Sequence, residues 1–149
     1  MNELSREQQE RLARHAIQRA VARESDRLFE PAKSPAEKLR AAGLDRAQVH
    51  NLENIAYSTD RLSDIYDFLK KQTGRPGRLG QKWQHENVGP ELLSALSSLG
   101  REANQIATTV RIEYPEAIDD DAARRIHLEL CREYLKHVAA HYQYSEAVQ

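Results

Sequence analysis

Apolar residues recur every three or four positions over most of the chain, and this spacing constrains the fold more than any other feature. From Val49 to Leu69, and again from Leu92 to Val110, the apolar side chains fall on one face of a helix. No stretch has the pattern of a strand. The sequence therefore predicts an all-α protein.

Capping signals set the first helix boundaries. Ser5 is the predicted N-cap of a long, mostly exposed helix over residues 4–29. A capping box at Ser34 predicts a second, short helix with Gly43 as its C-cap. Asp45 then caps the helix that carries the first apolar stripe.

The first apolar stripe is either one long helix or two helices joined by a tight turn at residues 58–60. Glycines and a proline predict a loop over residues 74–89. A further helix is expected between Gly89-Pro90 and Tyr114-Pro115. The acidic run 119–121 is expected to open the last helix, which should end near Tyr144.

These signals predict one domain of about five to six helices over residues 1–149, with an N-terminal helix in 1–30 and the bundle core in 44–144. The 22 basic and 23 acidic side chains nearly cancel, which argues against nucleic-acid binding through the whole surface. The single cysteine, Cys131, cannot form an internal disulfide and is expected to be packed. No apolar segment opens the chain, so we expect a cytoplasmic protein without a membrane partner.

Basic residues concentrate at the start of the predicted loop. Thirteen residues without an acid contain Lys70, Lys71, Arg75, Arg78 and Lys82. Lysine and arginine beside flexible glycines are suited to a phosphate backbone, and Trp83 and His85 are placed to stack on a base or ribose. Cations at a helix C-terminus also offset the helix dipole, which is the alternative interpretation.

Six arginines lie in the first helix: Arg6, Arg11, Arg14, Arg19, Arg23 and Arg27. They alternate with acids, so we interpret this helix as a solvated face with ion pairs between residues four apart.

The last predicted helix carries two patterns with possible chemistry. Arg132 and His137 resemble the Arg-x4-6-His motif of HEPN-type ribonucleases, although an acid, Glu133, follows the arginine. His137 and His141 share a helix face with Glu133 and are a weak signal for a metal site, because no third ligand is placed. We expect both patterns to be structural, and we expect no cofactor.

Three segments in order resemble the small subunit of type III-A (Csm) CRISPR effector complexes, or a related small subunit of another type III complex. They are RAQVHNLENI (46–55), FLKKQTGR (68–75) and EYLKHVAAHYQY (133–144). His50 departs from the family, which usually carries arginine before the asparagine. The resemblance spans about two thirds of the chain.

The resemblance implies a non-catalytic protein whose copies stack head to tail in a ribonucleoprotein filament, beside other CRISPR subunits and facing guide and target RNA. Lys70, Lys71, Arg75 and Arg78 would contact the RNA backbone, with Arg46, Arg61 and Lys82 as second-rank candidates. An HEPN-like ribonuclease using Arg132 and His137, and a helical dimerisation or adaptor module, are the alternatives.

Overall fold

The computed structural model describes residues 4–148, and this part of the chain contains helices but no strand. The α-helices are α1 (Arg6–Leu28), α2 (Lys33–Ala41), α3 (Arg46–Ser58), α4 (Leu62–Thr73), α5 (Arg78–Gln84), α6 (Val88–Glu113) and α7 (Ala122–Ala147). A short 3-10 helix, η1 (His85–Asn87), links α5 to α6. The predicted all-α bundle is confirmed.

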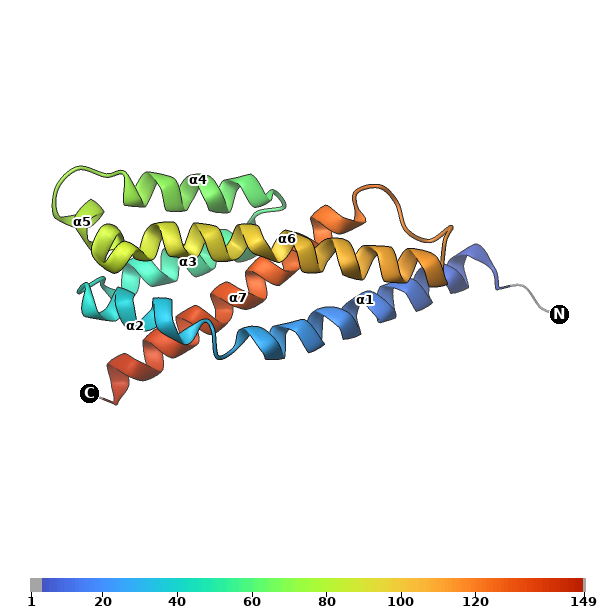
Figure 1. The fold of residues 1–149 in the computed structure, drawn as a ribbon, viewed down its shortest axis with the longest axis horizontal. Coiled ribbons are helices and arrows are strands. Elements are labelled where there is room, and N and C mark those ends of the chain that lie inside the picture. Colours follow the sequence, from blue (N-terminus) through green and yellow to red (C-terminus); the bar gives the residue numbers. More distant parts are fainter. Residues whose placement is uncertain (1–3, 149) are drawn as a thin grey trace.

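Helix α7 is the centre of the bundle. It packs against α1, α2, α3, α4 and α6, and Figure 1 shows it running obliquely from the middle of the molecule to the C-terminus. Apolar positions on several of its sides are buried, which a helix needs when neighbours surround it. These positions are Ile126, Leu130, Leu135 and Val138, together with Tyr134 and Tyr142.

The hydrophobic core joins buried side chains of α2, α3, α4, α5 and α6 to those along α7, from Ile126 to Tyr142. Its largest fully buried side chains include Trp83, Leu39, Leu52, Ile65, Leu69, Leu92 and Leu96. Helix α1 contributes little to this core, because only Ala13 and Ser25 are buried along it. The prediction of a mostly exposed first helix is therefore confirmed.

Three predicted caps are present. The Ser5 hydroxyl accepts from the backbone N–H of Gln8 at 3.1 Å, and the Gln8 side chain accepts from the Ser5 N–H in return. The Asp45 carboxylate accepts from the N–H of Gln48 at 3.0 Å. Gly43 follows α2 with φ +79°, a conformation that glycine adopts without a steric cost.

Other predicted boundaries were wrong. Helix α2 begins at Lys33 after Ala32, and no side chain caps it, so the Ser34 capping box does not form. Residues 74–89 are not one loop, because α5 and η1 lie inside them. The last helix continues past Tyr144 to Ala147. Residues 49–69 belong to two helices, so the second of the two alternatives is correct.

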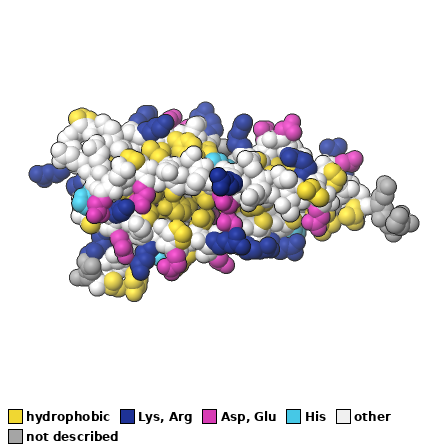
Figure 2. All heavy atoms as spheres, viewed as in Figure 1, with side chains coloured by type: hydrophobic (Ala, Val, Ile, Leu, Met, Phe, Trp, Pro, Cys, Tyr) yellow, Lys and Arg dark blue, Asp and Glu magenta, His cyan; other side chains and the backbone are white. Residues whose placement is uncertain are grey.

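The surface carries charges of both signs. Figure 2 shows lysine and arginine side chains interspersed with acidic ones, with apolar atoms visible near the middle of this face. None of the helices in residues 4–148 has the combination of length and hydropathy needed to cross a membrane.

Candidate nucleic-acid interface

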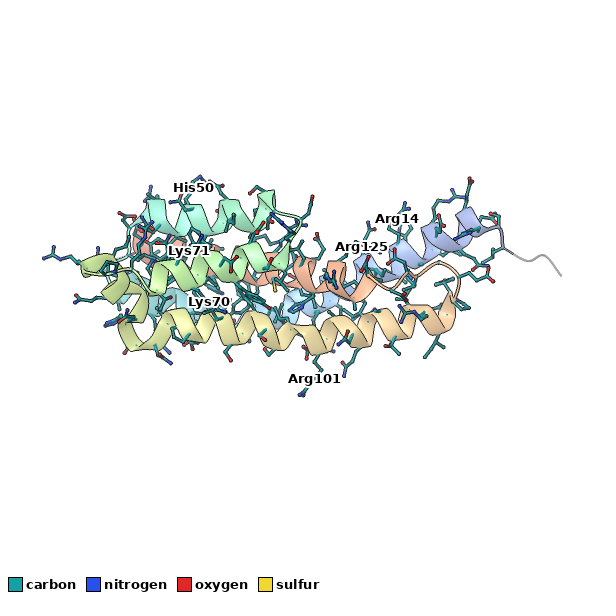
Figure 3. All side chains as sticks on the ribbon, turned by 90° about the horizontal axis from the view of Figure 1, so that it is seen from above. Arg14, His50, Lys70, Lys71, Arg101 and Arg125 are labelled. Carbon is teal, nitrogen blue, oxygen red and sulfur yellow. The ribbon has the colours of Figure 1, made fainter. Side chains whose placement is uncertain are left out.

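The predicted RNA contacts gather where α4 turns into α5. Lys70 and Lys71 are exposed in the last turn of α4, where the positive charges also offset the helix dipole. Arg75 follows in the turn and Arg78 opens α5, and both are exposed. We call these four residues, Lys70, Lys71, Arg75 and Arg78, the basic corner. Figure 3 shows Lys70 and Lys71 near the end of α4.

Glycines shape the turn under the basic corner. Gly77 has φ +81°, a backbone conformation that a side chain would strain, and it directs the chain into α5. A Cβ on Gly80 would lie only 1.7 Å from the carbonyl oxygen of Arg75, so only glycine allows this approach. The Gln84 side-chain amide donates to the carbonyl of Thr73 at 2.7 Å and ties α5 back to α4.

The buried side chain of Trp83 fixes α5, and with it one side of the basic corner, to the hydrophobic core. The indole is fully buried and meets the ring of Phe68 edge-on, with ring centroids 6.5 Å apart. The prediction that Trp83 stacks on a base or ribose is therefore wrong, because the ring is in the hydrophobic core. His85 is exposed in η1, 4.0 Å from the carboxylate of its neighbour Glu86, so its predicted stacking on RNA stays a prediction.

The basic corner is electrostatically uncompensated. Within residues 4–148, no carboxylate lies within 4.0 Å of any of its four cations. This holds even for Asp67, which stands one turn before Lys71 in α4. The side chains are solvated, so their charge is available to a partner at modest desolvation cost. The basic stretch that the sequence shows is therefore also a surface of exposed, unpaired positive charge in the structure.

The second-rank cations differ from the corner. Arg46 forms an ion pair with Glu146 at 3.1 Å, and Arg61 forms one with Asp64 at 3.5 Å. Arg61 also precedes α4, so the twelve-residue helix separates it from the corner by about 18 Å. Lys82 is half-buried on α5.

His50 lies on the outer side of α3, away from α4 (Figure 3), and 3.9 Å from Glu53. The structure thus brings four of the seven predicted RNA contacts together as exposed, unpaired cations, and His50 does not join them.

Arg132 and His137 contact different helices. The Arg132 guanidinium donates to the carbonyl oxygens of Ala56 and Thr59, at the end of α3, and also contacts Glu129. The His137 imidazole meets the hydroxyl and carbonyl of Ser25, in α1, at 2.9 and 3.0 Å. The two side chains therefore do not converge on one site within a copy.

The histidine pair is also used in packing. The Nε2 atom of His141 lies 2.7 Å from the carbonyl oxygen of Phe29, which favours the tautomer that donates there. No group of three or more histidine, cysteine or acidic side chains within residues 4–148 is arranged to hold a metal ion.

Cys131 is fully buried, and its thiol lies 3.6 Å from the carbonyl of Leu96. Burial raises the pKa of this thiol to about 12. The packed position predicted for Cys131 is therefore confirmed, and at neutral pH the thiol is protonated and shielded from reagents.

A comparison of the chain with protein families, with curated proteins and with solved structures finds no match.

Proposed function

We propose that this protein is a non-catalytic small subunit of a type III CRISPR ribonucleoprotein, acting in the cytoplasm. Its copies would stack in a filament beside the other subunits, and the basic corner would contact the backbone of guide or target RNA. The proposal rests on the resemblance of residues 46–55, 68–75 and 133–144 to this family and on the charge of the corner.

The observation that carries the proposal is the uncompensated charge of the basic corner. Four exposed cations lie around one turn, while Arg46 and Arg61 are paired with acids. Phosphate contacts need donors and positive charge but no base-specific geometry. A closely packed turn held by Gly80 and Trp83 presents such donors in a fixed place.

In a repeating assembly, each copy of the subunit needs only a few weak contacts to the RNA backbone. When copies line one strand, each adds the same few phosphate contacts, and the avidity of the strand grows with their number. Sequence recognition is then left to pairing between guide and target, so the subunit needs no side chains that read bases. A chain of net charge −1 with one basic corner meets this requirement.

The test is a salt titration of binding to labelled single-stranded RNA. Replacing Lys70, Lys71, Arg75 and Arg78 by alanine should weaken binding strongly at low salt. Each lost phosphate contact should reduce the slope of log K against log salt by about 0.7.

A matched control removes four other cations. Replacing Arg11, Arg14, Arg101 and Arg124, which are also exposed, changes the net charge equally and should leave the slope close to that of the unchanged protein. If both variants lost RNA affinity equally, binding would depend only on net charge. If the corner variant bound RNA with unchanged affinity and salt dependence, the proposed contact would be refuted.

A further inference from the structure

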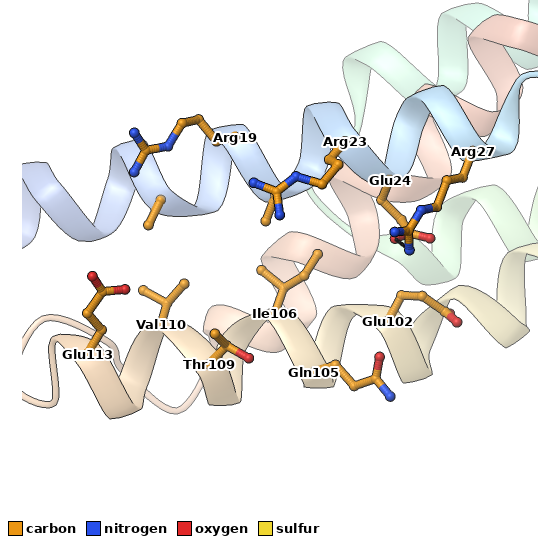
Figure 4. Close-up of a pocket in the computed structure, with 12 residues that line it drawn as sticks. Arg19, Arg23, Glu24, Arg27, Glu102, Gln105, Ile106, Thr109, Val110 and Glu113 are labelled. Atoms are coloured by element: carbon orange, nitrogen blue, oxygen red, sulfur yellow. Dashed lines mark hydrogen bonds and ion pairs between the residues drawn. The ribbon is translucent and has the colours of Figure 1, made fainter.

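A groove lies between α1 and α6 (Figure 4). Its volume is about 370 Å³. Ala16 and Ala20 of α1 line its floor, together with Ile106 and Val110 of α6. The two helices run antiparallel along it (Figure 1). The groove thus resembles one half of a bundle with small side chains on one helix and larger ones on the other.

The two rims of the groove carry opposite charge. Arg19 and Arg23 stand on the α1 rim, and Glu102 and Glu113 stand on the α6 rim. Figure 4 shows Arg19 across from Glu113, whereas Glu102 lies toward the other end, across from Glu24 and Arg27.

The four rim charges are not used within the chain. In the part of the chain that the structure describes, Arg19, Arg23, Glu102 and Glu113 form no ion pair. The prediction that the arginines of α1 pair with acids four residues away is correct for Arg6, which bonds Glu10, and Arg27 pairs instead with Glu24, three residues away. Opposite charges therefore face each other across the groove without meeting.

We propose that this groove is the interface of a closed dimer formed by two copies of the chain. A twofold axis parallel to the groove places the α1 rim of each copy on the α6 rim of its partner. Arginine then meets glutamate on both sides of the axis, as an isologous interface requires. A twofold axis across the groove would instead bring arginine onto arginine, so the rim charges select one arrangement.

Packing supports the same arrangement. The two grooves would face each other and form a four-helix bundle in which every neighbouring pair of helices is antiparallel. Ala16 and Ala20 of one copy would lie opposite Ile106 and Val110 of the other, so that small side chains meet large ones. The exposed ion pairs would fix orientation more than affinity, and we expect a weak dimer.

The rim composition argues against RNA as the occupant. Arg19, Arg23 and Arg27 are balanced by Glu24, Glu102 and Glu113 along the same groove. A polyanion would gain from the arginines and be repelled by the glutamates. A second copy of this surface matches both signs at once. This closed dimer is independent of the proposed RNA-binding role and uses a different surface from the basic corner.

The test is a charge swap measured by light scattering after size-exclusion chromatography at low salt. The unchanged protein should approach twice its chain mass of 17.1 kDa as its concentration rises, and not grow further. The Arg19→Glu/Arg23→Glu variant has two acidic rims, and Glu102→Lys/Glu113→Lys has two basic rims. Each variant alone should be monomeric, and an equimolar mixture should form heterodimers.

Two controls make the result specific. Arg11→Glu/Arg14→Glu makes the same charge change on the same helix outside this groove, and it should leave the dimer intact. The four-alanine variant of the basic corner should also dimerise, which separates this interface from RNA binding. A monomeric unchanged protein, a dimer insensitive to the rim variants, or a mixture that stays monomeric would each overturn the proposal.

Discussion

The Nε atom of Arg132 donates to the carbonyl oxygen of Ala56 at 2.8 Å, and this bond links the central helix α7 to the last turn of α3. The last carbonyls of a helix have no partner inside it. The same guanidinium also reaches the carbonyl of Thr59, so one charged side chain serves two of these groups. Because the Arg132 side chain is only 17% exposed, water replaces it poorly.

Replacing Arg132 by methionine should therefore destabilise the fold. The stem remains packed, but two carbonyls lose a charged donor, and we expect a loss of about 1.5–3 kcal/mol. Urea unfolding followed by circular dichroism measures the change. Lys136→Met is the control on the same helix, because its exposed pair with Glu133 should contribute less than about 1 kcal/mol. Equal losses for the two variants would contradict the role assigned to Arg132.

The histidines of α7 should hold the C-terminal end of α1. His137 bonds Ser25, His141 bonds the carbonyl of Phe29, and the Phe29 ring lies 4.4 Å from the His141 ring. Because α1 contributes little to the core, we expect the His137→Ala/His141→Ala variant to exchange amide hydrogens faster in α1 and much less so in α4.

The control for α1 docking is His50→Ala, which removes an exposed imidazole from α3 and should leave exchange in α1 unchanged. If α1 and α4 lost protection together in the double variant, the histidines would support the whole bundle and not α1 in particular.

Alanine at Gly80 should destabilise the fold more than alanine at Gly100. At Gly80 the new methyl would overlap the carbonyl of Arg75, so the turn must move, at a cost of about 1–3 kcal/mol. Gly100 lies inside α6, where its Cβ would lie 3.2 Å from the ring of His127, which bonds the carbonyl of Leu96. Only this ring has to shift, and the helix gains about 0.5–1 kcal/mol from alanine, so the net cost should be smaller. Thermal unfolding of both variants measures the difference. A tolerated Gly80→Ala would show that the turn is loosely packed.

Alkaline pH should weaken the fold, because three buried side chains lose their protons at a higher pH in the folded chain than in the unfolded chain. Burial raises the pKa of Cys131, Tyr134 and Tyr142 to about 12 in the folded chain. In the unfolded chain the cysteine titrates near about 8.5 and the tyrosines near about 10. The contribution of these groups to the free energy of unfolding is therefore full below about pH 8.5. It falls between about pH 8.5 and about pH 12, because in this range the unfolded chain has lost protons that the folded chain still holds.

Urea unfolding at a series of alkaline pH values measures this decline. In Cys131→Ala the loss between about pH 8.5 and 10 should shrink, whereas the steeper loss above about pH 10, due to the tyrosines, should remain. A free energy of unfolding that stays constant up to pH 11 would contradict the burial of these groups.

Local signals in the sequence predicted most of the helix positions. Ser5, Gly43 and Asp45 cap helices through contacts within four residues, so no distant part of the chain is needed to identify them. The Ser34 box failed although its residues were suitable. The chain enters α2 through consecutive turns after α1, so the helix starts before the serine and its hydroxyl has no free N–H to cap.

Trp83 shows why the site was predicted only in part. Its place among glycines and charges favoured a loop, and a ring exposed in a loop suits stacking on a base. Burial of the indole against Phe68 stabilises the short α5, an energy that comes from α4 and is invisible in the local sequence.

The sequence by itself determined that the chain is helical, where most helices begin and end, and that cations concentrate between Lys70 and Lys82, because periodicity, capping and charge are local properties. The tertiary structure alone decided which charges remain available. Arg46 pairs with Glu146, one hundred residues away, and Arg132 donates to carbonyl oxygens at the end of α3, whereas the basic corner and the rims of the α1–α6 groove keep unpaired charge. Pairing depends on distances through space, and these are set by how the helices pack around α7.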